Sequence, residues 1–508
     1  MNDSKQRKLG AALSYLSIII TTLIQLLFTP FLIKKLGQSE YGLYSLVNSI
    51  IGYLMILDLG FGNAIIVYTA KYKANNDIES ENKLHGMFKV IFIIIGIIAM
   101  LLGLVLYLNV DNIFSNTMTN VELSKTKIMM LILTFNLGIS FGFSIYTSII
   151  NAYEKFVYQK IISLIGIVLK PALMIPLLVL GYKSIPLTIV ITVVNLFTMI
   201  MNYYYCKYKL KINIKFKGFD KILFKTIFGY SIWLFIGTIV DKINWSVDNF
   251  VLGAVVGTAA VSIYSVAAQL NTLFINLSTA ISGVLLPKMS TMVAKKASTD
   301  ELTNEFIKVG RIQYYVIFLM CSGLIVFGKQ FINIWVGPSY KDAYYVALIL
   351  IIPVCFPLIQ NLGLSIMQAM NKYKFKSIST LIMAIANVFI SIVLAKMYGP
   401  IGSAIGTAIA LIFCNIFLIN IYYYRVIKLD VIKFWGNIFI MTIKMLIPLI
   451  IIVPLIYFLN LGDLLTLIVF IPLYCLLYAA DCYFIIINDY EKSTIKNICK
   501  RFKKVKKI

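Results

Sequence analysis

The sequence has little of what soluble enzymes use for chemistry. One histidine occurs among 508 residues, and 13% of the residues are charged, whereas an ordinary soluble domain has about 25%. A lone histidine, His85, cannot build a histidine-based metal cluster or a catalytic triad with redundancy. The seven cysteines never take a CxxC or CxxxC spacing, so we expect neither a zinc site nor a disulfide framework. Walker A, nucleotide-fingerprint and EF-hand patterns are also missing, and we expect no cofactor and no ATPase activity.

Apolar residues dominate instead. They make up 60% of the chain, with a mean hydropathy of +0.89, and they form long runs broken by charged loops. Since a membrane-spanning helix needs about 20 such residues, we predict an all-α polytopic membrane protein with fourteen spans. These lie near residues 9–34, 41–69, 87–108, 128–150, 157–180, 184–206, 222–250, 258–286, 309–328, 343–367, 376–396, 401–424, 435–459 and 464–487. The first run is too long for a signal peptide and is expected to be retained.

The basic residues that give the net charge of +25 are distributed according to the predicted topology. With the N-terminus placed in the cytoplasm, 35 of the 46 basic residues fall on the cytoplasmic side and 8 on the other. This asymmetry is a strong positive-inside signal. We therefore predict a multi-pass protein of the cytoplasmic membrane with both termini in the cytoplasm. The lipid bilayer is its expected surrounding, and nucleic acid is not needed to explain the charge.

Two passages recur at nearly the same spacing. "LGQSEYGLYSLV" from Leu36 is echoed from Leu252, and "SIINAYEKFVYQK" from Ser148 is echoed from Ser365, which gives spacings of 216 and 217 residues. This predicts two parallel six-helix lobes, as in transporters that alternate access around a central site. The expected divisions are residues 1–217, 218–425, 426–490 for two appended helices, and 491–508 for a basic tail. An inert duplication is the alternative.

Polar side chains within the seventh predicted span share one helical face. They are Ser231, Thr238, Asp241, Trp245 and Asp248, and the repeat pairs Asp241 with Gln25 of the first span. Ionisable groups inside a span are costly and usually face a cavity. We predict that Gln25, Thr238, Asp241 and Trp245 line a substrate path, the alternative being a helix contact held by polar groups.

Lys170 lies near the middle of the fifth predicted span, directly before the helix-kinking Pro171. A cation at this depth suits a phosphate or pyrophosphate group, and Lys242 is a second candidate. The repeat pairs Lys170 with Asn387, which is also polar. The alternative is that Lys170 pairs internally with an aspartate in a neighbouring span.

Three aspartates are candidates for coupling transport to an ion. Asp58 begins "DLGFGNA", where Gly60 and Gly62 permit local unwinding. Asp241 and Asp248 lie nearer the outer end of their span, so Asp248 is alternatively expected to reach water. A carboxylate satisfied by neighbouring helices is an equal alternative for Asp58.

The passages "LGQSEYGLYSLVNSIIGYLMILDLGFGNAI", "VDNFVLGAVVGTAAVSIYSVAAQL" and "MQAMNKYKFKSISTLIMAIANVFISIVLAKMYGPIGSAIGTAIA", with the 6 + 6 + 2 arrangement, resemble bacterial polysaccharide biosynthesis flippases of the Wzx type. These belong to the multidrug, oligosaccharidyl-lipid and polysaccharide exporter superfamily. The resemblance implies a bacterial flippase that moves an undecaprenyl-pyrophosphate-linked oligosaccharide to the outer leaflet, for a capsule or O-antigen-like polymer. It implies a polar central cavity, a groove for the lipid tail on helices 13 and 14, and a polysaccharide polymerase and other envelope-assembly proteins as partners.

Three other functions stay open at this point. A cation-coupled multidrug exporter of the same superfamily usually has twelve helices, so the appended pair counts against it. A membrane enzyme such as a polysaccharide polymerase or a lipid-to-sugar glycosyltransferase generally carries catalytic residues in a large outer loop. The longest outer connector here, near 109–127, carries only Asp111 and Glu122 as acids. A non-transporting scaffold for envelope assembly would tolerate single substitutions in the cavity.

Overall fold

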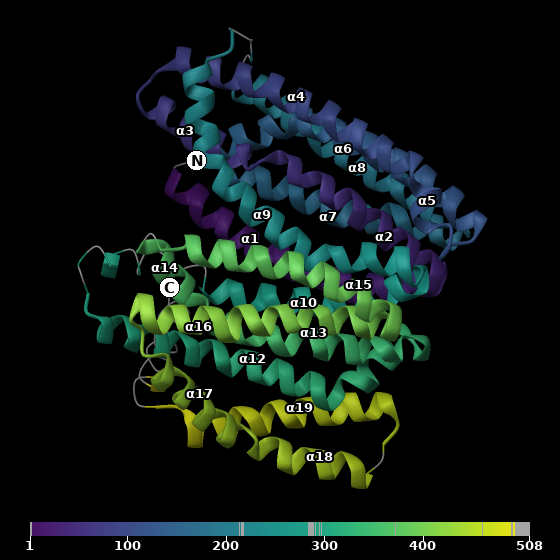
Figure 1. The fold of residues 1–508 in the computed structure, drawn as a ribbon, viewed down its shortest axis with the longest axis vertical. Coiled ribbons are helices and arrows are strands. Elements are labelled where there is room, and N and C mark those ends of the chain that lie inside the picture. Colours follow the sequence, from purple (N-terminus) through teal and green to yellow (C-terminus); the bar gives the residue numbers. More distant parts are fainter. Residues whose placement is uncertain are drawn as a thin grey trace, which may run out of the picture. The chain divides into compact units, whose positions relative to one another are not determined.

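The chain folds into long helices, as the apolar runs predict. The computed structural model describes residues 3–212, 214, 218–282, 289, 291–293, 295, 297–370, 372–459, 461–488 and 491–492 (Figure 1). No strand occurs among these residues, and twelve of their helical segments are long and apolar enough to cross a membrane. The prediction of an all-α polytopic membrane protein is confirmed.

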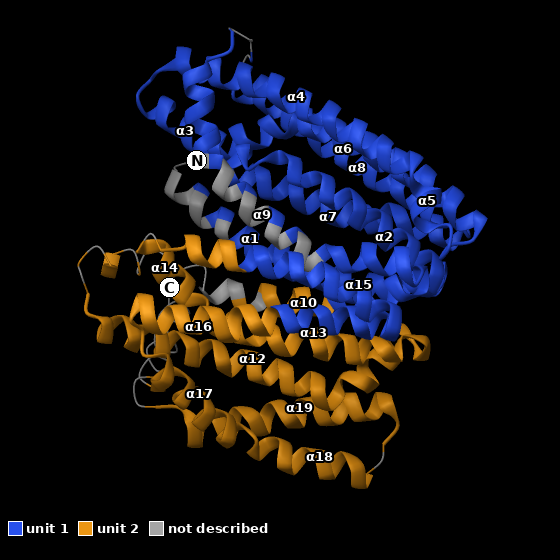
Figure 2. Ribbon diagram, viewed as in Figure 1, with its two compact units in different colours: residues 1–268, 380–410 blue, residues 269–379, 411–508 orange. Residues whose placement is uncertain are grey.

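The helices divide between two compact units, shown in separate colours in Figure 2. One unit holds residues 1–268 and 380–410, and the other holds 269–379 and 411–508. The lobe boundaries inferred from the repeat stay a prediction.

The first unit is built from the N-terminal helices. These are α1 (Asp3–Leu36), α2 (Gln38–Leu54), α3 (Phe61–Ala74), α4 (Ile78–Leu108), α5 (Val110–Phe114), α6 (Asn120–Ala152), α7 (Phe156–Val179), α8 (Ser184–Tyr204) with the π-helix Tyr205–Lys209, α9 (Lys221–Val255), most of α15 (Lys374–Leu411) and the start of α10 (Thr258–Ser282). Within it, α6 packs against α4 and α8, α1 against α7, and α2 against α9. Exposed apolar side chains cover the outer faces of these helices, as lipid contact requires.

The second unit is organised around a 38-residue helix, α12 (Thr299–Val336). The rest of the unit comprises the end of α10, α13 (Lys341–Ile359), α14 (Asn361–Ala369), the segments Ile412–Leu418, Ile419–Tyr422 (α16) and Tyr423–Ile427, and then α17 (Val431–Met445), α18 (Ile447–Leu459), α19 (Asp463–Asp481) and the π-helix Cys482–Ile486. Both α17 and α19 pack against α12, and α18 packs against α19. The two appended spans are thus joined to the unit through α12.

Polar residues mark where several helices begin. Thr119 and Ser298 each form a capping box with the glutamate three positions later, at the starts of α6 and α12. Asp77, Asp220 and Asp430 accept hydrogen bonds from backbone N–H groups in the first turns of α4, α9 and α17. These caps satisfy N–H groups that a helix leaves unpaired at its start.

The fourteen predicted spans and the twelve structural candidates differ in two places. The candidate Lys374–Ile427 contains two predicted spans. The chain turns between them at Gly399, which has a positive φ of 59°. A Cβ on Gly402 would clash with the carbonyl oxygen of Leu394, so the two arms pack closely as an antiparallel hairpin. The seventh predicted span falls on α9 (Lys221–Val255), a single 35-residue helix that is not among the twelve because many of its side chains lie outside the described part of the structure.

The second predicted span is broken, whereas the sequence pattern predicted one helix over 41–69. α2 ends at Leu54, a 3₁₀ turn follows over Met55–Asp58, and α3 begins at Phe61. Leu59 and Gly60 between them adopt left-handed conformations with φ of 53° and 71°. The expected local unwinding therefore occurs on the N-terminal side of Gly62.

Candidate functional site

A buried polar cluster surrounds Asp248. Tyr264 of α10 donates a hydrogen bond of 2.5 Å to Oδ2 of Asp248, and Thr407 of α15 donates to the same oxygen at 2.9 Å. Ser403, one turn before Thr407, donates to Oδ1 at 2.7 Å. The carboxylate of α9 is thus held by hydroxyl groups from two other helices, all within the first unit.

Asn387 belongs to the same cluster. Its Nδ2 donates to Oγ1 of Thr407 at 3.1 Å, and its Oδ1 accepts from Ser391 at 2.9 Å. Because Asn387 and Ser391 lie on one arm of the α15 hairpin and Ser403 and Thr407 on the other, the cluster ties the two arms together. The side chain of Asn387 is fully buried.

Asp248 is buried, whereas the alternative prediction was that it reaches water. Its exposed fraction is 0%, so the side chain does not reach water in this conformation. A carboxylate at this depth is costly unless it is protonated, hydrogen-bonded or paired with a cation. Carboxylate, hydroxyl and amide oxygens together can hold a proton or a monovalent cation. No group of three or more His, Cys, Asp or Glu residues suited to a metal ion occurs among the described residues.

Asp58 lies just before the second half of the broken span. Its carboxylate lies beside the backbone N–H groups of Gly60 and Gly62 at the start of α3. A negative charge is favourable at a helix N-terminus, which explains why Asp58 is tolerated there. Ser148 of α6 also lies close to Gly62.

Lys170 is half-buried in α7 and forms no ion pair with a described carboxylate. Of the three aspartates that could pair with it, Asp58 and Asp248 are engaged elsewhere, as described above, and the side chain of Asp241 lies outside the described residues. Lys242 is likewise half-buried, and its Nζ lies against Gly52 of α2. Gln25 is half-buried in α1.

Three of the predicted site residues cannot be placed by their side chains. The backbone of Thr238, Asp241 and Trp245 is part of α9, but their side chains lie outside the described part of the structure. Their assignment to the substrate path stays a prediction.

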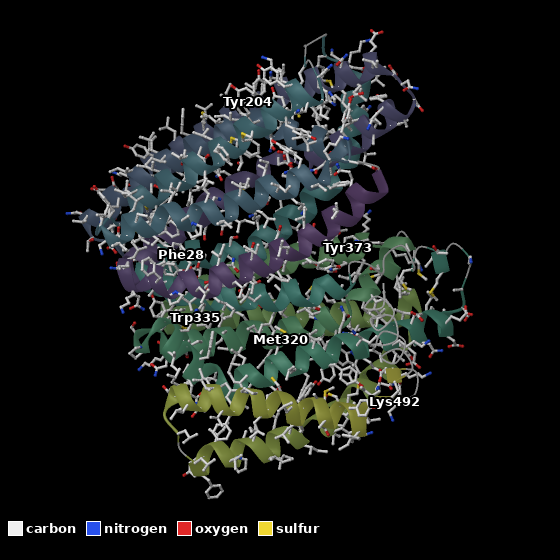
Figure 3. All side chains as sticks on the ribbon, turned by 180° about the vertical axis from the view of Figure 1, so that it is seen from behind. Phe28, Tyr204, Met320, Trp335, Tyr373 and Lys492 are labelled. Carbon is white, nitrogen blue, oxygen red and sulfur yellow. The ribbon has the colours of Figure 1, made fainter. Side chains whose placement is uncertain are left out.

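An apolar groove of about 480 Å³ lies within the second unit, between α12, α13 and the appended helix α17. Its lining residues are Tyr314, Ile317, Phe318, Cys321, Ile325, Ile352, Cys355, Phe356, Ile359, Trp435, Ile438, Phe439 and Thr442. The polar atoms at its wall are satisfied, since the Tyr314 hydroxyl and Thr442 Oγ1 bond at 2.5 Å and Trp435 donates to Asn420 at 3.0 Å. The groove thus offers an almost purely hydrocarbon surface. A second apolar pocket of about 270 Å³ involves α19 and Met320 of α12, which Figure 3 labels.

Sequence reasoning missed the hydroxyl partners of Asp248. Ser403 and Thr407 stand four residues apart in an otherwise apolar hairpin arm, and Asn387 and Ser391 repeat that spacing on the other arm. Paired polar residues at this spacing on an apolar helix share one face and were a usable signal. Tyr264 gave no comparable signal.

One protein family and two individual proteins are similar to this chain. The profile of the family described as "Polysaccharide biosynthesis protein" matches residues 9–293. A protein of Shigella flexneri named "Putative O-antigen transporter" is 23% identical over 407 residues, which cover 77% of this chain and 92% of that protein. "Uncharacterized membrane protein EpsK" of Bacillus subtilis (strain 168) is 21% identical over 429 residues, which cover 81% of each chain.

Solved structures share the fold. The lipid II flippase MurJ, in an inward closed conformation, superposes with a TM-score of 0.71 at 19% identity, covering 94% of this chain and 98% of that one. An inward-facing multidrug resistance transporter of the MATE family gives a TM-score of 0.65 at 14% identity, covering 78% and 96%. These likenesses establish the fold that the chain adopts.

Proposed function

Because this chain belongs to the polysaccharide biosynthesis protein family, we propose that it is a flippase that carries a lipid-linked oligosaccharide from the cytoplasmic to the outer leaflet of the bacterial cytoplasmic membrane. The proposed substrate is an undecaprenyl-pyrophosphate-linked repeat unit for a surface polysaccharide. A relative named as an O-antigen transporter supports this class of substrate.

The observation that carries the proposal is the apolar groove closed by α17. An exporter of small soluble compounds has no need of such a surface, whereas a polyprenyl chain must stay in a hydrocarbon environment while its headgroup crosses. We assign the groove to the polyprenyl tail. The lipid II flippase covers 94% of this chain, whereas the multidrug transporter covers 78%. This difference favours a role of the appended helices in holding the lipid tail.

We assign the headgroup to the polar interior of the helices. We assign the ammonium of Lys170, which has no carboxylate partner among the described residues, to the substrate phosphate. Lys242 is proposed as a second cation, with Gln25, Thr238, Asp241 and Trp245 along the path.

The Asp248 cluster is proposed as the site of a coupling proton or sodium ion. Exchange of such an ion would change the charge of a carboxylate that links α9, α10 and both arms of α15. Asn387 is proposed to support the ion site through its contact with Thr407. Asp58 and Asp241 are further candidates for ion coupling. The energy for transport would come from an ion gradient.

Leaflet exposure of the lipid-linked oligosaccharide tests the proposal. In cells depleted of the protein, an impermeant sugar-specific probe should detect the intermediate only after permeabilisation. Intermediates that appear outside without polymerisation would instead support a polysaccharide polymerase. A multidrug exporter would leave their distribution unchanged.

The groove has its own test. Cys355→Trp places an indole in the groove and should lower flipping about tenfold at normal abundance. The matched control is Ile450→Trp on α18, where the side chain is 69% exposed. Equal activity of the two variants would remove the tail assignment and leave the headgroup assignments standing.

A further inference from the structure

A third, smaller pocket lies among the appended helices, apart from the groove and the pocket described above. It measures about 230 Å³ and is lined by Ile447, Pro448, Ile451, Leu477, Ala480, Asp481, Phe484 and Ile485. Seven of these residues are apolar. Asp481, the last residue of α19, is the one ionisable group in the lining.

Asp481 is buried without a hydrogen-bond partner in the part of the chain that the structure describes. Its exposed fraction is 6%, and neither carboxylate oxygen has a hydrogen-bond partner among the described residues. A buried carboxylate in this state costs several kcal/mol unless a ligand supplies donors. The described residues thus supply no N–H or O–H donor to this carboxylate.

A cation stands close to this carboxylate. Lys444 of α17 lies near enough for its charge to act on Asp481, yet the two form no ion pair within 4.0 Å. The Nζ atom of Lys444 donates instead to the carbonyl oxygen of Ile485 at 3.4 Å. The ammonium of Lys444 and the carboxylate of Asp481 thus lie beside the same apolar pocket without forming an ion pair.

The position of the pocket matches a lipid headgroup. Asp481 lies 18 residues after Asp463 at the start of α19, a distance of about 27 Å along a helix. The hydrocarbon core of a bilayer is about 30 Å thick, so Asp481 reaches the membrane boundary. The π-helix Cys482–Ile486 follows at once, and single π turns are frequent at functional sites.

We propose that this pocket binds a phospholipid whose headgroup carries a primary ammonium beside its phosphate, as phosphatidylethanolamine does. The ammonium donates hydrogen bonds to the two oxygens of Asp481, the phosphate faces Lys444, and the acyl chains lie along Ile447, Ile451 and Phe484. A quaternary ammonium has no N–H to donate. The hydroxyl groups of an anionic phosphatidylglycerol headgroup could donate to Asp481, but they carry no positive charge to offset the carboxylate. The site is thus selective for a donor-bearing, zwitterionic headgroup.

Retention of lipids by the purified full-length protein tests this. The protein is placed in nanodiscs with equal parts of phosphatidylethanolamine, phosphatidylcholine and phosphatidylglycerol, and retained lipids are counted by native mass spectrometry. We expect at least fivefold enrichment of phosphatidylethanolamine over phosphatidylcholine. When its N-methyl or N,N-dimethyl form replaces phosphatidylethanolamine in the nanodiscs, the enrichment should fall stepwise. Equal retention of phosphatidylethanolamine and phosphatidylcholine would overturn the proposal.

Variants locate the effect. Asp481→Asn and Lys444→Gln should each reduce the enrichment about fivefold. Asp463→Asn is the control, because Asp463 lies at the other end of α19 and accepts a hydrogen bond from Asn333. If Asp481→Asn changes thermal stability but not lipid selectivity, Asp481 has a structural role and the proposal fails. Free phosphoethanolamine at lipid concentration should not compete, and full competition would exclude the phospholipid as occupant.

Discussion

Tyr264 donates a 2.5 Å hydrogen bond to Asp248 and thereby joins α10 to the last turns of α9. Both side chains are buried. The hydroxyl group holds one oxygen of a carboxylate that two residues of α15 also contact. A change in the charge of this carboxylate therefore affects α9, α10 and α15 at once.

The first prediction concerns this carboxylate. Asp248→Asn keeps the shape of the side chain but removes its charge, and we expect flipping to fall about tenfold or more, which corresponds to at least 1.4 kcal/mol. Export should be measured at matched membrane abundance. Asp111→Asn is the control, because Asp111 is exposed and pairs with Lys127 instead of with a member of the cluster. Full export by Asp248→Asn would remove Asp248 from ion coupling.

The second prediction concerns Lys170. Lys170→Ala should reduce flipping about tenfold or more, because a hydrogen bond to a charged group contributes about 1.5–3 kcal/mol. Lys170→Arg should retain part of the activity. Lys160→Ala, on the same helix but near its predicted cytoplasmic end, should export normally. Normal export by the Lys170→Ala protein would show that the phosphate is held elsewhere.

The third prediction concerns two glycines. Gly402→Ala should destabilise the protein by about 1–3 kcal/mol, the usual cost of overpacking, because the added methyl group would clash with the carbonyl oxygen of Leu394. Gly436→Ala, in α17, has nothing within 4 Å of the added atom and should stabilise by about 0.5–1 kcal/mol. Thermal unfolding in one detergent compares the two. Equal shifts would contradict the close packing of the hairpin arms.

The fourth prediction concerns an ion pair beside the last described residues. Arg311 donates to both carboxylate oxygens of Glu491 at 2.7 and 3.0 Å, just before Lys492, which Figure 3 labels. Burial alone would raise the pKa of Glu491, but the hydrogen bonds from Arg311 and from the backbone of Asn488 outweigh it and hold that pKa below its usual value. The pair therefore stabilises the folded protein above the ordinary glutamate pKa of about 4.3. This contribution is lost as the pH falls through the lower, folded-state value.

Glu491→Gln tests that sign. The variant should unfold at a lower temperature than the parent at pH 7, with the difference shrinking toward pH 3.5. Removing one member of a buried pair costs about 3–5 kcal/mol. Glu79→Gln serves as the control, because Glu79 forms an exposed pair with Lys83. A difference that grows as the pH falls would show that Glu491 is not stabilised as a carboxylate.

Much of the fold could be predicted because apolar run length alone places helices in a membrane protein. The break after Leu54 was harder, since Gly60 marks only its end and Met55–Asp58 looks like ordinary apolar helix. The site was predicted only in part. Asp248 and Asn387 were both singled out, but their contacts with Ser403 and Thr407 join residues up to 159 positions apart. Such pairings depend on how helices pack and not on local pattern.

The hairpin at Gly399 has a practical consequence for work on living cells. The chain reverses there through one non-helical residue and Pro400, so this end of the hairpin offers almost no loop to an antibody, a protease or an inserted epitope. An insertion at this point would have to separate two closely packed arms and, with them, the residues around Asp248.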